Sequence, residues 1–239
     1  MIFTKEQKQA LWNAARRPAA NETAVETAIA DFIFNTIVDA PQLELTCEPG
    51  LDNPKVISKF QYGSRVYGCN TSESDFDFIV VREQPEEKID SVEILGNNFT
   101  FYNEKGFQKD LDNHEISALE CFFLPAHMSE GKTDYTFELN LQKLRHSISQ
   151  VSSNSWVKAK KKLADGETYI AQKSLFHSLR IVEFGIQIAT HGKIVDYSSA
   201  NCYLDAIKKM PLDWSVWESR FKQTHKLLLT DFRKLAPKI

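Results

Sequence analysis

The stretch Gln61–Val81, QYGSRVYGCNTSESDFDFIVV, decides the fold that we expect from this sequence. An extended segment runs into Gly63-Ser64, where a glycine allows close backbone approach and successive N–H groups can form an anion-binding nest. The chain re-enters a strand at Asp75-Phe76-Asp77. Because residues i and i+2 of a strand point to the same face, Asp75 and Asp77 share a face and the neighbouring phenylalanines face the core.

The residue types in this stretch indicate phosphate and metal chemistry. Two neighbouring carboxylates repel each other unless a cation lies between them, and Mg²⁺ (or Mn²⁺) suits such oxygen ligands. We therefore predict that Asp75 and Asp77 bind the metal, and that Gly63, Ser64 and Arg65 bind the phosphates of a nucleoside triphosphate. A phosphate site beside a dicarboxylate metal site is the minimum required for phosphoryl or nucleotidyl transfer.

The hydrophobic periodicity changes twice along the chain. Residues 1–42 have the pattern of two helices, with Asn21 a candidate N-cap of the second. Between residues 43 and 125, strands alternate with short helices. The expected strands are Val56–Phe60, Phe76–Val81, and a hairpin of Val92–Leu95 and Phe99–Tyr102 around Gly96-Asn97-Asn98; the expected helices are Glu104–Leu111 and Ile116–Phe123.

The rest of the chain is expected to be helical. The predicted helices are Leu139–Val151, Trp156–Leu163, Glu167–Thr190 closed by His191-Gly192, and Trp214–Leu235. This organisation predicts an α+β protein: a small mixed sheet with N-terminal helices over residues 1–135, and a C-terminal helical domain over residues 136–239.

Composition excludes several classes of protein. The chain has 239 residues and a formal net charge of −3, so it is not a uniformly basic nucleic-acid coat. Its four widely spaced cysteines favour buried free thiols. The charged start, Met1–Lys8, lacks a signal-peptide pattern, and no run approaches the roughly 18 apolar residues of a membrane span. We expect a cytoplasmic protein without a membrane partner.

Gly63–Gly68, then Ser74–Asp77 and an apolar strand, resemble the signature of the DNA polymerase β-like nucleotidyltransferase superfamily. The resemblance is closest to a bacterial and phage branch of predicted nucleotidyltransferases, which includes members linked with RNA repair. Later stretches resemble the same branch: Phe99–Tyr102, Ala118–Pro125 and Lys173–Arg180. Spanning roughly residues 55–210, the resemblance implies a small mixed sheet with helices, two divalent cations, and transfer of a nucleoside monophosphate from a triphosphate such as ATP.

One position departs from that pattern. The superfamily supplies a third carboxylate from a neighbouring strand, and this position falls on Asn98, four residues before Tyr102. An amide offers a metal one carbonyl oxygen but no charge. Either Glu93, Glu104 or Glu120 substitutes, or the second metal is weakly bound, or the strand register differs by a few residues. A catalytically silent protein that binds a nucleotide or a partner therefore remains the alternative.

Three further charged features of the sequence bear on the expected site and its substrate. Lys173, His177 and Arg180 share one side of a helix, from which they can reach a triphosphate or an acidic acceptor, or form an ordinary charged face. Glu120, on an otherwise apolar helix, is expected to pair with an arginine, with metal ligation as its second role. A lysine run, Lys158–Lys162, tilts the choice of acceptor slightly toward an RNA 3′ end over a protein or small-molecule hydroxyl.

Overall fold

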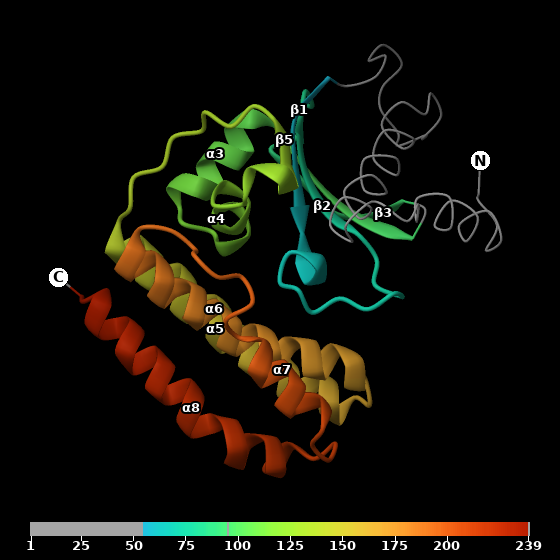
Figure 1. Ribbon diagram of the computed structural model, residues 1–239, viewed down its shortest axis with the longest axis vertical. Coiled ribbons are helices and arrows are strands. Elements are labelled where there is room, and N and C mark those ends of the chain that lie inside the picture. Colours follow the sequence, from blue (N-terminus) through green and yellow to red (C-terminus); the bar gives the residue numbers. More distant parts are fainter. Residues whose placement is uncertain (1–54, 95, 239) are drawn as a thin grey trace, which may run out of the picture. The chain divides into compact units, whose positions relative to one another are not determined.

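The computed structural model describes residues 55–94 and 96–238, and the expected N-terminal helices lie outside them. Within the described residues the protein is a mixed α/β structure with a mixed sheet and helices (Figure 1). Its elements are β1 (Val56–Tyr62), the 3₁₀ turn η1 (Gly63–Arg65), β2 (Asp77–Arg82), β3 (Lys88–Ile94), β4 (Asn97–Tyr102), α3 (Glu104–Asp112), α4 (Ile116–Phe122), the 3₁₀ turn η2 (Ala126–Met128), β5 (Ser129–Gly131), α5 (Leu141–Ala164), α6 (Thr168–His191), α7 (Asn201–Lys208) and α8 (Trp214–Leu235).

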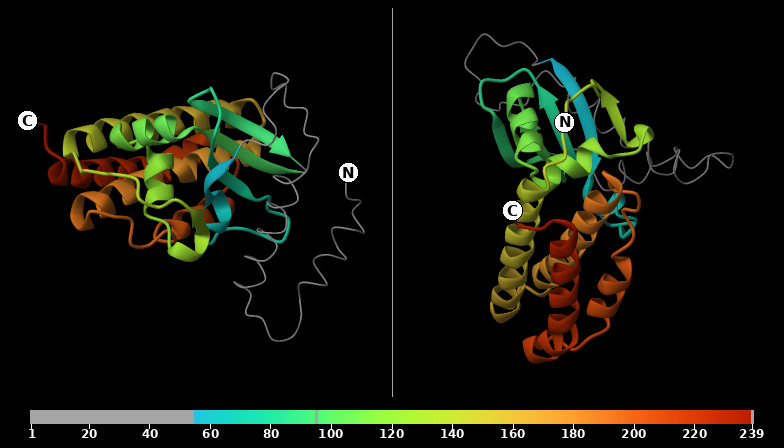
Figure 2. Two further views of the ribbon diagram at one scale, coloured as in Figure 1. Left: turned by 90° about the horizontal axis from the view of Figure 1, so that it is seen from above. Right: turned by 90° about the vertical axis from the view of Figure 1, so that its left-hand side faces the viewer.

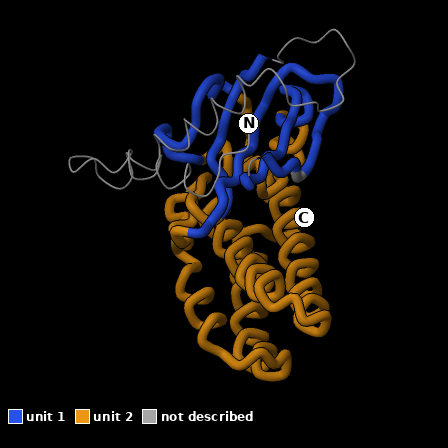
Figure 3. Tube along the Cα trace, turned by 90° about the vertical axis from the view of Figure 1, so that its right-hand side faces the viewer, with its two compact units in different colours: residues 1–63, 73–107, 124–134 blue, residues 64–72, 108–123, 135–239 orange. Residues whose placement is uncertain are grey.

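The described chain divides into two compact units, coloured separately in Figure 3. The described part of the first unit comprises residues 55–63, Glu73–Phe107 and Leu124–Asp134, and contains the whole sheet. The second comprises Ser64–Ser72, Gln108–Phe123 and residues 135–238. The second unit thus resumes at Tyr135, close to the expected boundary, but it also takes in the loop after Gly63 and helix α4.

The sheet in the first unit has the strand order β3-β4-β2-β1-β5. Strands β2 and β4 are parallel, and the other pairs are antiparallel. The predicted β3–β4 hairpin is confirmed, but Asn97 and Asn98 belong to β4 and not to the turn. Strand β5, only three residues long, was not predicted.

Alternation of side chains along the strands builds the core of this unit. Phe76 and Phe78 are buried, as expected, in a cluster with Val80, Ile94, Phe99 and Phe101. On α3, Phe107 stacks on Phe60 with ring centroids 5.2 Å apart. The aromatic packing therefore holds β2 and β4 in register, and this register places the polar residues at the ends of these strands.

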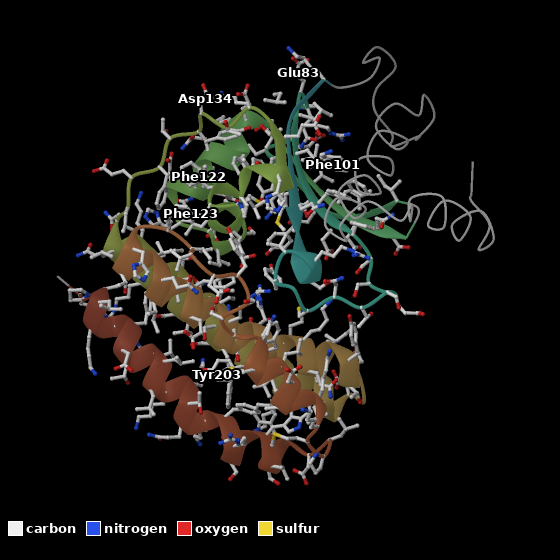
Figure 4. All side chains as sticks on the ribbon, viewed as in Figure 1. Glu83, Phe101, Phe122, Phe123, Asp134 and Tyr203 are labelled. Carbon is white, nitrogen blue, oxygen red and sulfur yellow. The ribbon has the colours of Figure 1, made fainter. Side chains whose placement is uncertain are left out.

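The second unit is built on α5 and α6, which run side by side with α8 along them (Figures 1 and 2). Its main core includes Leu175, Leu179, Trp217 and Phe221. Helix α6 ends at Gly192, whose positive φ of 73° closes the helix as predicted. Phe122 and Phe123, labelled in Figure 4, lie at the end of α4 with ring centroids 5.2 Å apart.

Two helical predictions needed correction. The expected helices Leu139–Val151 and Trp156–Leu163 form one continuous helix, α5. The intervening serines do not break it: Ser152 is buried, and its Oγ donates a 2.8 Å hydrogen bond to the Ser178 carbonyl of α6. Helix α7 was not predicted.

None of the described helices combines the length and apolarity needed to cross a membrane. The three cysteines in the described residues are free thiols, and Cys121 is buried as expected. Cys202 is exposed, contrary to the expectation of a buried thiol.

Candidate functional site

The first unit brings the two predicted aspartates together at the start of β2. Asp75 and Asp77 are both half-buried. Asp75 Oδ2 accepts a 2.5 Å hydrogen bond, and Asp77 Oδ1 a 3.2 Å hydrogen bond, from the same nitrogen, Nδ2 of Asn98. The two carboxylates therefore face the same side and converge on one point, as expected from their i, i+2 spacing.

Asn98 occupies the neighbouring-strand position that the resemblance to the superfamily implied. The parallel pairing of β2 with β4 sets Asp77 directly opposite Asn98. The residue that faces the two aspartates from β4 is therefore an amide.

Strand β4 also fixes the backbone between the aspartates. The Phe76 N–H donates to Oδ1 of the buried Asn97 at 3.1 Å, and the Phe76 carbonyl accepts from the Asn98 N–H at 2.9 Å. Asn97 is therefore a positioning residue that sequence reasoning missed, because Gly96-Asn97-Asn98 has the composition of a turn. In the sequence, Asn97 can be recognised only by its position directly before Asn98, the residue that pairs with Asp77.

Gly63 lies against the Asp77 carboxylate. Its φ is +79°, and a Cβ at this position would overlap the Asp77 carboxylate group. Only glycine therefore combines this turn with so close an approach of the backbone to an aspartate. Gly63, Asp75, Asp77 and Asn98 form one cluster within the first unit, which we call the aspartate site.

The proposed substitutes for the third carboxylate do not complete this site. Among the described residues, no group of three or more His, Cys, Asp or Glu side chains is placed to hold a metal. Glu93 lies opposite Asn98 on β3 but is exposed, and Glu104 pairs with Lys132 at 2.7 Å. Glu120 is 1% exposed and belongs to the second unit.

The donor atoms of the aspartate site fit a hard divalent cation. Two carboxylate oxygens already converge on a partly positive N–H group, and this is the arrangement that a cation would use. Rotation of the Asn98 amide would present its oxygen in place of its nitrogen. The residues present can therefore supply two charged ligands and one neutral oxygen ligand.

Glu120 is at the centre of a second cluster, the Glu120 cluster, within the second unit. Its Oε2 accepts a 2.5 Å hydrogen bond from the Tyr67 hydroxyl, and its Oε1 lies 3.4 Å from Nη2 of Arg180. The Arg180 guanidinium carbon also lies 3.5 Å from the Tyr67 ring centroid. The prediction that Glu120 pairs with an arginine is confirmed, and these contacts account for its carboxylate without a metal.

The Glu120 cluster also fixes the loop that follows Gly63. Tyr67 lies on this loop, and its backbone carbonyl accepts a 2.8 Å hydrogen bond from Nδ2 of Asn201. The Tyr197 hydroxyl donates to the Glu120 carbonyl at 2.6 Å, and the pKa of Tyr197 is raised by burial and by the charge of Glu120. This cluster is therefore a structural anchor for Ser64–Ser72.

The remaining predicted residues also lie in the second unit. Ser64 and Arg65 are half-buried on the anchored loop, where their carbonyls accept from the N–H groups of Cys69 and Gly68 at 3.0 and 3.3 Å. Lys173 is exposed on α6, with its ammonium 5.1 Å from the Tyr169 ring centroid.

The three residues expected to share one side of α6 differ in burial. Arg180 is buried, and its Nη2 donates to Nδ1 of His177 at 2.8 Å. Burial and then the Arg180 charge hold the pKa of His177 well below its ordinary value. Of the three, only Lys173 extends into solvent.

No protein-family model matches the sequence, and no curated protein matches it significantly.

Proposed function

We propose that this protein is a metal-dependent nucleotidyltransferase, which transfers a nucleoside monophosphate from a nucleoside triphosphate to an acceptor hydroxyl. The observation that carries the proposal is the convergence of Asp75 and Asp77 on one point beside Gly63. The resemblance of Gly63–Gly68 and Ser74–Asp77 to the DNA polymerase β-like superfamily supports the same reaction.

The residues of the chain have distinct roles in this proposal. Asp75, Asp77 and the Asn98 side-chain oxygen would hold Mg²⁺ or Mn²⁺. A bound cation neutralises charge on the triphosphate oxygens. Gly63, Ser64 and Arg65 are the residues that the resemblance assigns to the phosphates, for which they would provide N–H, hydroxyl and guanidinium donors.

The reaction is an in-line displacement. The acceptor oxygen forms a bond to the α-phosphorus, the bond from this phosphorus to the bridging oxygen breaks, and pyrophosphate leaves with that oxygen. The acceptor hydroxyl loses its proton to solvent. Catalysis then depends on positioning and charge neutralisation, without a covalent enzyme intermediate.

Transfer of label from α-labelled nucleotides tests this proposal. The full chain is incubated with each of the four nucleoside triphosphates, with Mg²⁺ or Mn²⁺, and with total cellular RNA or lysate, and labelled products and pyrophosphate are measured. We expect Asp75→Asn and Asp77→Asn each to lower transfer by at least about 100-fold while the melting temperature stays nearly unchanged.

Asp90→Asn is the matched control, because Asp90 is an exposed aspartate of the same sheet that pairs with Lys88. It should retain full activity. Unchanged transfer in either site variant would remove the assignment of the aspartate site.

The alternative is a catalytically silent nucleotide-binding or partner-binding protein. The Asn98 amide between the two aspartates favours it, because an amide lies where the superfamily supplies a third carboxylate. Calorimetric titration with ATP, with and without Mg²⁺, separates the two functions when combined with the pyrophosphate measurement. Binding without pyrophosphate release, for all four nucleotides, would establish the silent protein.

A further inference from the structure

Helix α5 carries no acidic residue. Its 24 residues, Leu141–Ala164, include no Asp or Glu. They include six cations, namely Lys143, Arg145, Lys158, Lys160, Lys161 and Lys162. The whole chain has 32 acidic and 29 basic residues, so this helix is strongly positive in a protein that is slightly negative overall. Such separation of charge marks an electrostatic binding surface for an anion.

The exposed side of α5 forms one wall of a groove within the second unit. The groove has a volume of about 790 Å³ and lies between α5 and the C-terminal end of α8. None of the described residues that line it is acidic; the lining includes Arg145, His146, Gln150, Asn154, Arg233 and Lys238.

The groove has a neighbour beside it along the same stretch of α5. This adjoining hollow shares Gln142, His146, Gln150 and Asn154 with the groove and adds Lys143 and one carboxylate, Glu115. Toward the C-terminal end, the spacing of four residues from Gln150 to Asn154 leads to Lys158 on the same side of the helix. At 1.5 Å per residue, the side of α5 from Gln142 to Lys158 is about 24 Å long.

Contacts inside the unit preform the groove. Nη1 of Arg145 donates hydrogen bonds to the carbonyls of Arg233 and Ala236, at 3.1 and 2.7 Å. These bonds fix the end of α8 against α5, so no rearrangement is needed to create the wall that carries Arg233 and Lys238.

We propose that the groove and the lysines that follow it on α5 bind the sugar-phosphate backbone of single-stranded RNA. The cations would neutralise phosphates without a competing carboxylate in the groove. The side-chain amides of Gln150 and Asn154 both donate and accept, as recognition of a ribose 2′-OH requires. Because no aromatic residue lines the described groove, binding is independent of base sequence.

This surface is independent of the proposed nucleotidyl transfer, because it shares no residue with the aspartate site. Its test is binding of the full chain to fluorescein-labelled 20-nucleotide oligouridine, followed by anisotropy between 50 and 200 mM KCl. We expect the affinity to fall with salt, with a slope of about −0.7 for each phosphate neutralised. Oligoadenosine of the same length should bind equally well.

Gln150→Glu combined with Asn154→Glu places two negative charges in the groove on exposed helix positions. The matched control is Ser219→Glu combined with Gln223→Glu, two exposed positions with the same spacing on α8 outside the groove. We expect the first pair to weaken RNA binding at least about tenfold, and the control less than about twofold. Circular dichroism and thermal melting of both pairs confirm that they fold.

Four results would overturn the proposal: no salt-dependent binding, equal weakening by the control pair, tighter binding to a 20-base-pair duplex or to anionic lipid vesicles, or equal affinity for single-stranded DNA. Loss of nucleotidyl transfer in the aspartate variants with RNA binding retained separates this inference from the proposed function.

Discussion

The aspartate site and the Glu120 cluster both contain carboxylates that are shielded from solvent, but they differ in the groups that contact those carboxylates. Glu120 is almost completely buried, and a guanidinium and a phenol compensate its charge. Asp75 and Asp77 are half-buried next to each other, and the group that lies between them is a neutral amide. A compensated buried charge holds an element in place, whereas two converging carboxylates around an amide are arranged to accept a cation.

The comparison predicts that breaking the Glu120 pair has the largest effect on stability. Arg180→Met leaves a buried carboxylate without its cation and should lower the free energy of unfolding by about 3–5 kcal/mol. Urea denaturation measures this change. The double variant Arg180→Met with Glu120→Leu should recover much of the loss, because it removes the buried charge as well. A double variant as unstable as the single one would contradict the pairing.

Asn98→Asp should make the free energy of unfolding of the protein depend on a metal bound at the aspartate site. The change removes the donated hydrogen bonds and adds a third negative charge, so we expect a loss of about 2 kcal/mol in EDTA. Mg²⁺ should restore that stability and bind more tightly than to the natural protein. Thermal melting with and without Mg²⁺ measures both effects, and a variant that does not respond to Mg²⁺ would argue against a metal at this position.

A comparison of Gly63→Ala with a control variant should separate the effect of backbone strain from the effect of overlap with the Asp77 carboxylate. Gly166 is the matched control, since its φ of +78° equals that of Gly63 within a degree but no atom lies within 4 Å of a Cβ there. Gly166→Ala should lose about 1 kcal/mol. Gly63→Ala should lose at least as much and, because it displaces the Asp77 carboxylate, also weaken Mg²⁺ binding. Equal metal affinity in both variants would show that the close approach is irrelevant to the site.

A further expected effect concerns pH, and it belongs to the second unit. His225 has its pKa lowered to about 4 by burial, while its Nε2 lies 2.7 Å from Ser152 Oγ. Since Ser152 donates its one proton to the Ser178 carbonyl, Nε2 of the neutral imidazole donates to Ser152. Below its ordinary pKa of about 6.5, the unfolded chain binds a proton that the folded chain does not.

Stability should therefore be independent of this group above pH 6.5 and fall between pH 6.5 and 4, by about 1–2 kcal/mol. Denaturation at several pH values measures the slope, which His225→Gln should flatten. An unchanged slope in that variant would exclude His225 as the source. Lowered pKa values at His114 and His177, also in the second unit, add to the same trend.

The elements with clear periodicity were predictable from the sequence. The strands around Phe60 and Phe78 and the long helix ended by Gly192 follow directly from spacing and from a glycine cap. The break expected within α5 does not occur, because the polarity of Ser152 is satisfied by α6 and not by solvent. The hydrophobic pattern of residues 139–163 does not show that a serine in the middle of the helix is hydrogen-bonded to another helix.

The pairing of the two aspartates was predictable, because their i, i+2 spacing puts them on one face of a strand, whereas the place of Asn98 was expected only from the resemblance to the nucleotidyltransferase superfamily. The partner of Glu120 was predictable only as a residue type. Arg180 lies 60 residues further along the chain, and no periodicity links the two. The role of Asn97 was hidden in the same way, since its partner is the Phe76 backbone, 21 residues away.

The parallel pairing of β2 with β4 has a consequence for the order of folding. Strand β3 lies between them in sequence, but β4 lies beside β2 in the sheet. The amide of Asn98 therefore reaches the two aspartates only when the whole β3–β4 hairpin docks. Docking of this hairpin is thus the step that completes the aspartate site during refolding.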